Sequence, residues 1–412
     1  MEAQQKIIFH VDVNSAFLSW EAVRRLKEDQ AAIDLREIPA AIGGDRAKRR
    51  GVILAKSIPA KRFGIRTGEP VVDALRKCPE LYLTGADFKL YTQYSRALLQ
   101  ILSGYTPEVE QTSIDEAFLN MTGTKRLWGE PVEAARRIQE EVSTKLGFTV
   151  NIGISVNRLL AKMASDFEKP NRVHTLFPEE ISQKMWPLPV SELFFVGRAT
   201  TEKLHQLGIH TIGELARADV GMLRSHLKKQ GEAIWLCANG QDASVLSYEQ
   251  EESKGIGNST TIAFDVTDEG TAKLVLMSLT ETVGARLRRE HRKTEGLSVT
   301  IRNQEFQTSS HQMVLEHATN ITQELYQSAC RLFDELWDGS PIRLLGVTAN
   351  RLAGENEARQ LELFETVDYE KMERLDKAMD AIRSRYGSNA VKRASFLTEE
   401  RIDAMPGKQQ DR

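Results

Sequence analysis

The chain has 412 residues, of which 41% are hydrophobic and 27% charged, a composition typical of a soluble protein with several domains. The net charge of −3 neither favours nor excludes nucleic acid as a partner, because 55 Lys and Arg residues can still gather on one face. Three widely spaced cysteines and the lack of a long apolar run argue against a disulfide framework, a cysteine zinc site and a membrane span. We therefore expect a cytoplasmic protein.

The N-terminal 171 residues alternate between β-type and helical patterns, which predicts an α/β or α+β layer. The first strand ends beside Asp12, and the last helix stops before Pro170. Strands are predicted at 6–14, 81–85, 114–119 and 148–156, and helices at 15–26, 131–146 and 160–171.

Two adjacent acids, Asp115 and Glu116, interrupt the apolar strand within QTSIDEAFLN. Neighbouring side chains of a strand point to opposite faces, so one of the two must face the apolar side or the segment must bend. Buried carboxylates are costly unless they are paired or bind a cation. The pair therefore indicates either a metal site or an acidic turn in a surface hairpin. A sheet that brings Asp12 beside this strand would gather three carboxylates, a ligand set suited to Mg²⁺ and phosphoryl transfer.

The C-terminal half has a different organisation. Residues 191–240 are predicted to be helical, with Gly-centred turns at 196–200 and 207–215 whose helix N-termini could face an anion. A polar linker at 248–255 leads to an α+β region at 256–353. A charged tail with one predicted helix at 368–387 follows.

Six segments match the motifs of a known family, in the family's order. They are HVDVNSAF (10–17), RRGVILA (49–55), PAKRFGIRTGEP (59–70), SIDEAFLNMTG (113–123), NIGISVNRLLAKMASDFEKPN (151–171) and the Gly turns of 195–215. Together they resemble Y-family DNA polymerases of the bacterial polymerase IV type over roughly residues 6–350.

The resemblance implies an α+β, multidomain right-hand polymerase. Its palm would carry a ferredoxin-like mixed sheet, beside small fingers, a helical thumb with helix-hairpin-helix turns and an α+β little finger. The implied boundaries are palm 1–15 and 82–171, fingers 16–81, thumb 172–242, linker 243–255, little finger 256–353, and a C-terminal tail 354–412 that contains a clamp-binding peptide.

The resemblance also implies template-directed synthesis past damaged bases, by two-metal transfer of a nucleotide from dNTP to the primer 3′-OH. Two Mg²⁺ ions, replaceable by Mn²⁺, are the expected cofactors. The implied residues are Asp12, the Val13 backbone carbonyl, Asp115 and Glu116 for metal, Phe17 as the sugar gate, and Lys61, Arg62 and Lys162 for the nucleotide phosphates, with Lys169 as a further candidate. Each has an ordinary alternative, because Phe17 could be a core residue and the lysines could be solvated.

The expected partners are primer–template DNA, dNTP and the bacterial sliding clamp, and the protein is expected to be a monomer. Residues expected to contact DNA are Gly197 and Gly208 in the thumb turns and Arg286, Arg288, Arg289, Arg292 and Lys293 in the run ARLRREHRK. The run could equally be a solvated face. The clamp peptide would be QLELF, with Gln360, Leu361, Leu363 and Phe364 as its anchors, although a stray apolar patch is the alternative.

Departures from the family pattern keep two other functions open. Ile58-Pro59 replaces a common Tyr-Glu, and Lys61 replaces an Arg, which favours a looser grip on the nucleotide. A non-catalytic factor that binds DNA and the clamp on the same fold is therefore the main alternative. A nucleotide cyclase is a second one, suggested by GGDR at 43–46 alone.

Overall fold

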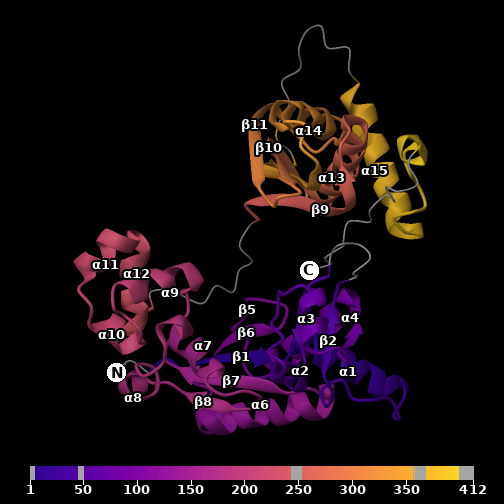
Figure 1. The fold of residues 1–412 in the computed structure, drawn as a ribbon. Helices are drawn as coiled ribbons and strands as arrows, with labels where there is room; N and C mark the ends of the chain where they lie inside the picture. Colours follow the sequence, from indigo (N-terminus) through magenta and orange to yellow (C-terminus); the bar gives the residue numbers. More distant parts are fainter. Residues whose placement is uncertain (1–4, 45–50, 243–252, 356, 358–367, 399–412) are drawn as a thin grey trace. The chain divides into compact units, whose positions relative to one another are not determined.

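The computed structural model describes residues 5–44, 51–242, 253–355, 357 and 368–398. The described chain divides into two compact units, one up to residue 242 and one from residue 253 (Figure 1). Both units combine helices with antiparallel or mixed sheets, so the predicted α+β class is confirmed.

A five-stranded mixed sheet, in the order β5-β6-β1-β7-β8, is the centre of the first unit (Figure 1). Strand β1 is fully buried and runs antiparallel to both β6 and β7, whereas β7 and β8 are parallel. The strands are β1 (Ile8–Val13), β5 (Val109–Gln111), β6 (Glu116–Asn120), β7 (Val150–Ser155) and β8 (Val173–Thr175).

The two faces of this sheet are covered by different helices because β-strand side chains alternate. Phe9, Val11 and Val13 enter the core formed with α1, α4 and α6, while Ile8 packs on the other face with Ala161 of α7. Asp12 shares the α7 side, so the fold points it away from the main core. The helices are α1 (Ala16–Glu28), α4 (Phe88–Ser103), α5 (Lys125–Trp128), α6 (Pro131–Leu146) and α7 (Arg158–Asp166).

A smaller sheet in the order β3-β2-β4 carries two short helices. Its elements are β2 (Ala40–Gly43), β3 (Ile53–Lys56), α2 (Ile58–Arg62), α3 (Val71–Lys77) and β4 (Tyr82–Thr84). Strand β4 pairs with β2 in parallel, although the predicted fingers end at residue 81. Likewise β8 joins the large sheet beyond the predicted palm boundary at 171. Short strands with little alternation give a weak local signal, and the boundaries between the regions stay predictions.

The rest of the first unit is helical. Short helices follow one another and share one core with Leu159, Leu160 and Met163 of α7. They are the 3₁₀ helices η2 (Pro178–Glu180) and η3 (Val190–Glu192), and α8 (Ile181–Lys184), α9 (Arg198–Gln206), α10 (Ile212–Arg217), α11 (Val220–Leu227) and α12 (Lys229–Ala238).

The second unit is an antiparallel sheet in the order β11-β10-β12-β9, with α13 and α14 packed against it (Figure 1). The tail helix α15 is present as predicted, and it packs against α13. The elements are β9 (Gly255–Val266), α13 (Glu269–Arg289), β10 (Arg292–Asn303), β11 (Thr308–Thr319), α14 (Thr322–Leu336), β12 (Ile342–Gly354), α15 (Tyr369–Tyr386) and the 3₁₀ helix η4 (Ala394–Thr398). Among the described helices, none is long and apolar enough to cross a membrane.

Candidate active site

Two of the three predicted carboxylates lie opposite each other on neighbouring strands. Asp12 of β1 and Glu116 of β6 are register partners. Asp115 precedes β6, and its backbone carbonyl accepts a hydrogen bond of 3.1 Å from the Val13 N–H. The fold therefore brings the three acids to one end of the β1–β6 pair, as the sequence predicts.

The adjacent acids nevertheless have different side-chain partners. Asp115 is half-buried in the turn before β6, and its Oδ1 accepts a hydrogen bond of 2.6 Å from the Ser113 hydroxyl. Glu116 instead contacts Lys162 of α7. Within the described residues, no three Asp, Glu, His or Cys side chains form a group that could hold a metal ion. The expected carboxylate triad is thus not preassembled among these residues.

Two lysines supply the positive charge instead. Lys162 Nζ lies 2.5 Å from Glu116 Oε1, and the Lys169 ammonium contacts Asp12 Oδ2. Asp166, at the end of α7, lies between the lysines, with oxygens 2.8 Å from Lys169 Nζ and 3.5 Å from Lys162 Nζ. Lys169 was only a further candidate in the sequence, and the structure places it directly on a predicted metal ligand.

Helix α7 can carry Lys162 to this position because it approaches β7 closely. A Cβ atom at Gly153 would lie 2.0 Å from the Ala161 carbonyl oxygen and 2.4 Å from the Ser165 nitrogen. A side chain at residue 153 would therefore push the helix off the sheet. The glycine in NIGIS is thus a packing requirement for the site.

Burial dominates the electrostatics of these acids. Burial raises the pKa of Asp12 to about 7, against the opposing effect of the Lys169 ammonium. Burial lowers the pKa of Lys169, but the Asp12 carboxylate reverses that effect and the net pKa is raised. Because only an ionised Asp12 can raise the pKa of Lys169, and the two groups are in direct contact, we describe them as an ion pair.

Glu116 is held in its ionised form more firmly. Burial opposes its ionisation, but His10 and Lys162 hold the pKa of Glu116 well below its usual range. His10 is fully buried behind it, with Nδ1 2.8 Å from the Ser165 hydroxyl. Burial lowers the pKa of His10, so the imidazole is neutral. The Lys162 ammonium is the cation that stabilises this charged carboxylate.

Phe17, the predicted sugar gate, lies in the first turn of α1, five residues after Asp12. Its ring is half-buried and stacks on Tyr91 of α4, with centroids 4.6 Å apart and planes inclined by 15°. Phe88 meets it edge-on at 6.3 Å. The ring is therefore held in one orientation by aromatic packing. Its gating role stays a prediction.

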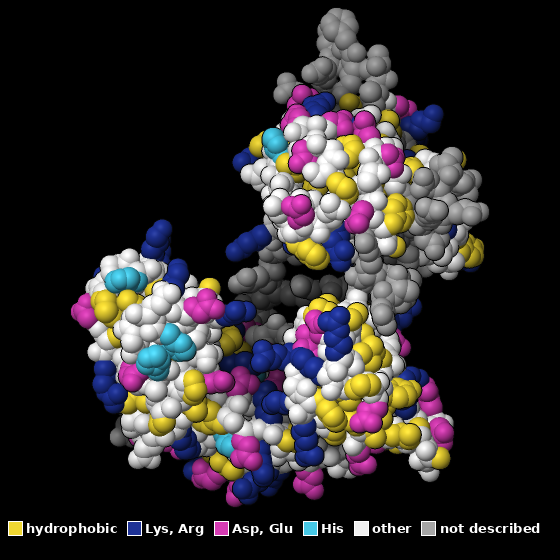
Figure 2. Space-filling view, viewed as in Figure 1, with side chains coloured by type: hydrophobic (Ala, Val, Ile, Leu, Met, Phe, Trp, Pro, Cys, Tyr) yellow, Lys and Arg dark blue, Asp and Glu magenta, His cyan; other side chains and the backbone are white. Residues whose placement is uncertain are grey.

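The structure does not join the other predicted phosphate ligands to the acids. Lys61 and Arg62 are exposed at the end of α2. Ser57 is the N-cap of this helix, and its hydroxyl accepts a hydrogen bond from the Ala60 N–H. Among the described contacts, none links either side chain to Asp12, Asp115 or Glu116. In the space-filling view, Lys and Arg side chains line the hollow between the helical lobe, which consists of α8 to α12, and the sheets of the first unit (Figure 2).

The two glycine turns of the helical lobe differ from each other. Gly197 is the exposed N-cap of α9, and no side chain caps that helix end. Gly208, with φ of 76°, instead ends α9. At the following helix α10, the Glu214 carboxylate accepts hydrogen bonds from the N–H groups of His210 (2.7 Å) and Thr211 (3.0 Å). The prediction that the second turn offers free N–H groups to an anion is therefore wrong, because the chain caps that helix itself.

The predicted basic run at 285–293 also needs correction. Arg288 is only 9% exposed, and its guanidinium donates to Asp376 (3.2 Å) and Asp380 (2.6 Å) of α15. It is a structural residue and not part of a DNA-facing surface. The remaining members are more accessible: Arg289 is exposed, and Arg286, Arg292 and Lys293 are half-buried, with Arg286 donating to the Gly257 carbonyl and Lys293 to that of Glu357.

Two predicted motifs fall wholly or partly beyond the part of the chain that the structure describes. The clamp peptide, Gln360 to Phe364, lies outside the described residues. Of the GGDR segment, Gly43 belongs to β2, while Asp45 and Arg46 are not described.

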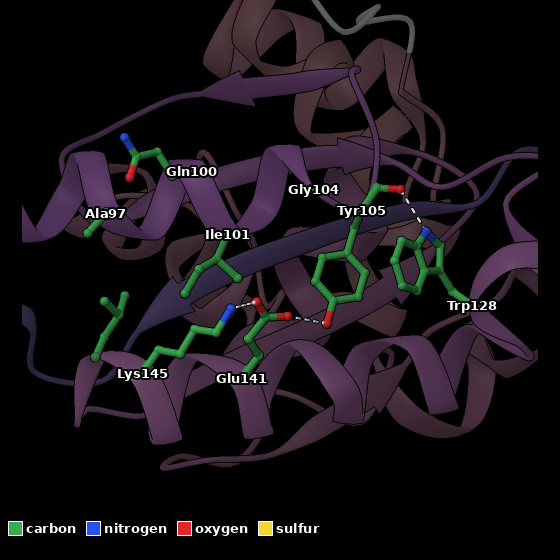
Figure 3. Close-up of a pocket in the computed structure, with 9 residues that line it drawn as sticks. Ala97, Gln100, Ile101, Gly104, Tyr105, Trp128, Glu141 and Lys145 are labelled. Carbon is green, nitrogen blue, oxygen red and sulfur yellow. Dashed lines mark hydrogen bonds and ion pairs between the residues drawn. The ribbon is translucent and has the colours of Figure 1, made fainter.

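An open groove of about 440 Å³ lies between α4 and α6, on the face of the five-stranded sheet opposite to α7 (Figure 3). Four of its polar side chains are hydrogen-bonded, because Tyr105 and Lys145 donate to Glu141 (2.8 and 2.7 Å) and Trp128 donates to the Tyr105 carbonyl (2.9 Å). The groove contains none of the acids, so it is not the candidate site.

Comparison with known proteins supports one assignment throughout the chain. Three models match: the impB/mucB/samB family at residues 11–166, the HHH motif of the IMS family at 178–209, and the impB/mucB/samB family C-terminal domain at 253–363. DNA polymerase IV of Clostridium acetobutylicum is 45% identical over 395 residues, covering 96% of this chain and 99% of the relative. DNA polymerase IV of Alkaliphilus oremlandii is 36% identical, covering 95% and 99%.

A solved structure gives the same result for the fold. The Y-family DNA polymerase chimera Dbh-Dpo4(243-245)-Dbh matches with a TM-score of 0.71 at 20% identity, covering 84% of this chain and 99% of the chimera. The predicted right-hand arrangement of α+β domains is therefore confirmed at the level of fold.

Proposed function

The chain belongs to the Y-family DNA polymerases of the impB/mucB/samB group, and from this premise we propose that it extends primers across damaged template bases by two-metal nucleotidyl transfer. The observation that carries the proposal is the pairing of Asp12 with Glu116 across β1 and β6, beside Asp115. Each of the paired acids forms an ion pair with a lysine, and both lysines, Lys162 and Lys169, belong to the motif at 151–171.

The donor set fits magnesium. Mg²⁺ prefers oxygen ligands and retains waters that a substrate can replace. Asp12, Asp115, Glu116 and the Val13 carbonyl would supply such oxygens. Asp12 is buried and Glu116 half-buried, and both already pair with ammonium groups, so the site favours cations. Bound Mg²⁺ would stabilise the charge that develops on the phosphate oxygens and the attacking oxygen. Mn²⁺ could substitute for it.

The residues of the chain would then position the reactants. The primer 3′-oxygen attacks the α-phosphorus of the dNTP, a new P–O bond forms, the bond to the β-phosphate breaks and pyrophosphate leaves, while the hydroxyl proton passes to solvent. The ammonium groups of Lys162 and Lys169 already lie at the acids. When the metal ions bind the carboxylates, the two lysines would be free to pair with the phosphates of the dNTP instead. Phe17, fixed by Tyr91, would exclude a 2′-hydroxyl.

Primer–template DNA and the sliding clamp are the remaining proposed partners. DNA would be held by the α9 N-terminus at Gly197 and by Arg289 and its accessible neighbours, as backbone contacts that weaken with salt. The segment at 360–364 would dock on the bacterial sliding clamp. We propose that the protein works as a monomer in the cytoplasm.

Primer extension by the purified protein tests the proposal. Templates with and without a defined damaged base should both be extended with Mg²⁺ or Mn²⁺, and omission of the metal should stop the reaction. Binding of primer–template without any extension would contradict the proposal and favour the non-catalytic factor. Extension that always stops before the damaged base would keep the polymerase but remove lesion bypass. Cyclic nucleotide formed from a triphosphate without DNA would instead indicate a cyclase.

A further inference from the structure

Two buried asparagines lie directly behind the lysine–carboxylate site. Asn14 follows β1, two residues after Asp12, and Asn151 lies in β7. Asn151 is fully buried and Asn14 nearly so. The Asn14 amide nitrogen donates to the Asn151 side-chain oxygen at 3.1 Å. Buried amides are costly unless all their polar atoms are paired, so the use of each atom is informative.

The oxygen of Asn14 accepts two hydrogen bonds. One comes from the hydroxyl of Thr149, the residue before β7, at 2.9 Å. The other comes from the backbone N–H of Asn171 at 2.9 Å, in the connection between α7 and β8. Asn14 therefore ties the strand that carries Asp12 to this connection.

Asn151 binds the same connection from the other side. Its amide nitrogen donates to the carbonyl oxygens of Ser165 (3.0 Å) and Glu168 (2.7 Å). Its oxygen also accepts from the backbone N–H of Arg172 at 3.2 Å. Both N–H groups and both lone pairs of this side chain are thus in use. Residues 168–172 belong to no helix or strand. Besides the Arg172 carbonyl, which accepts a hydrogen bond of 2.9 Å from the Ile152 N–H, the backbone of this segment is held by these two amides.

Lys169 lies within residues 168–172, the segment that the two amides hold. It is one residue from Glu168 and two from Asn171, and its ammonium contacts Asp12. We propose that Asn14 and Asn151 are positioning residues for Lys169: they fix the backbone on both sides of it and so aim its ammonium at the site. This inference rests on the proposed function, in which the ammonium meets the phosphates of the incoming dNTP.

The network also explains why residue 14 is an amide. In Asn14→Asp, an oxygen would replace the N–H that faces the Asn151 oxygen, and the two acceptors would repel each other. Turning the Asn151 amide over would relieve that contact, but it would then aim its oxygen at the Ser165 and Glu168 carbonyls. Either arrangement leaves buried polar atoms unpaired, which loosens the Lys169 segment.

The test combines hydrogen exchange with kinetics on the full chain. In Asn14→Ala, the Asn171 amide loses its acceptor, so a peptide spanning residues 168–173 should exchange faster in the metal-free protein, by about tenfold at that amide. The KM for dNTP should rise about tenfold with a smaller change in kcat, because the lost interaction is with the bound nucleotide. Asn14→Asp should act in the same direction.

A double mutant separates positioning from general destabilisation. If Asn14 acts through Lys169, adding Asn14→Ala to Lys169→Ala should raise the KM for dNTP no further than Lys169→Ala alone. The matched control is Asn120→Ala, because Asn120 lies on the same sheet and donates to Glu108 at 2.7 Å, away from the segment. It should change neither the exchange of 168–173 nor the KM. If Asn14→Ala does not fold, Asn14→Ser replaces it.

The outcomes distinguish this inference from the proposed function. Unchanged exchange at 168–173, or a KM effect that persists in full in the Lys169→Ala background, would overturn the positioning role. Faster exchange with no effect of Lys169→Ala on the KM would overturn it as well, since Lys169 would not serve the nucleotide. A wild-type protein that extends no primer contradicts the proposed function itself.

Discussion

At the scale of single residues, Asp115 separates catalysis from stability most clearly. Its described side-chain hydrogen bond goes to Ser113 in its own turn, and the carboxylate is only half-buried. Asp115→Ala should therefore abolish primer extension while changing the free energy of unfolding by less than about 1 kcal/mol. Gel-based extension measures the first quantity and thermal melting the second, and DNA-binding anisotropy checks that the variant still binds primer–template.

Asp166→Ala is the matched control for that substitution. Asp166 contacts both lysines but is not a predicted metal ligand, so its loss should alter the KM for dNTP and leave extension measurable. If Asp115→Ala still extends primers, the metal assignment is wrong.

The second residue-scale prediction concerns the sugar gate. Phe17→Ala should allow ribonucleotides to be incorporated, because the ring that stacks on Tyr91 would be gone. Loss of the packed ring should also cost about 1–3 kcal/mol of stability, since the residue is only half-buried. Incorporation of dNTP and rNTP opposite the same template base gives the discrimination ratio.

Tyr91→Phe provides the comparison for the gate. The Tyr91 hydroxyl is buried without a hydrogen-bond partner among the described residues, so its removal keeps the supporting ring and should leave sugar discrimination unchanged. An unchanged ratio in Phe17→Ala would remove the gating role.

At the scale of elements, local sequence patterns predict most helices and strands, but they do not predict which elements contact one another. The helix predicted at 131–146 matches α6, and the strand predicted at 148–156 contains β7, because amphipathic spacing and alternation are local properties. The contact of Lys169 with Asp12 spans 157 residues and has no local signal. For the same reason the sequence could not reveal that α15 buries Arg288.

Helix α15 leads to a stability prediction. Asp376 is buried, accepts a hydrogen bond from the Thr322 N–H at 2.7 Å and pairs with Arg288 at 3.2 Å. Asp376→Ala would leave a buried guanidinium and an α14 N–H short of a partner, so we expect a loss of about 3 kcal/mol. Denaturant unfolding, followed by a signal from the second unit, measures it.

Glu373→Ala is the control on the same helix. Glu373 pairs with Lys377 at 3.0 Å on the surface, and such a pair contributes at most about 0.5 kcal/mol. Equal effects of the two substitutions would mean that α15 does not support the second unit.

At the scale of the whole molecule, the chain path constrains how the proposed clamp peptide can work. The peptide at 360–364 lies in sequence between the end of β12 and the start of α15, and both elements belong to the second unit. Four residues lie between Phe364 and Tyr369, so these two residues are at most about 18 Å apart when the chain is fully extended. A clamp bound to the peptide would therefore lie beside the second unit.

Changing the three apolar anchors to alanine, Leu361→Ala, Leu363→Ala and Phe364→Ala together, should remove stimulation by the clamp and keep clamp-independent extension near the wild-type rate. The reason is that such peptides bind through apolar side chains in a pocket of the partner, while the acids lie in the first unit. Extension with and without the clamp, at equal enzyme concentration, gives the stimulation factor.

Leu375→Ala serves as the control, because Leu375 is an exposed apolar residue of α15 outside the peptide. Equal loss of basal and stimulated synthesis in the triple variant would mean that the segment stabilises the protein and does not bind the clamp.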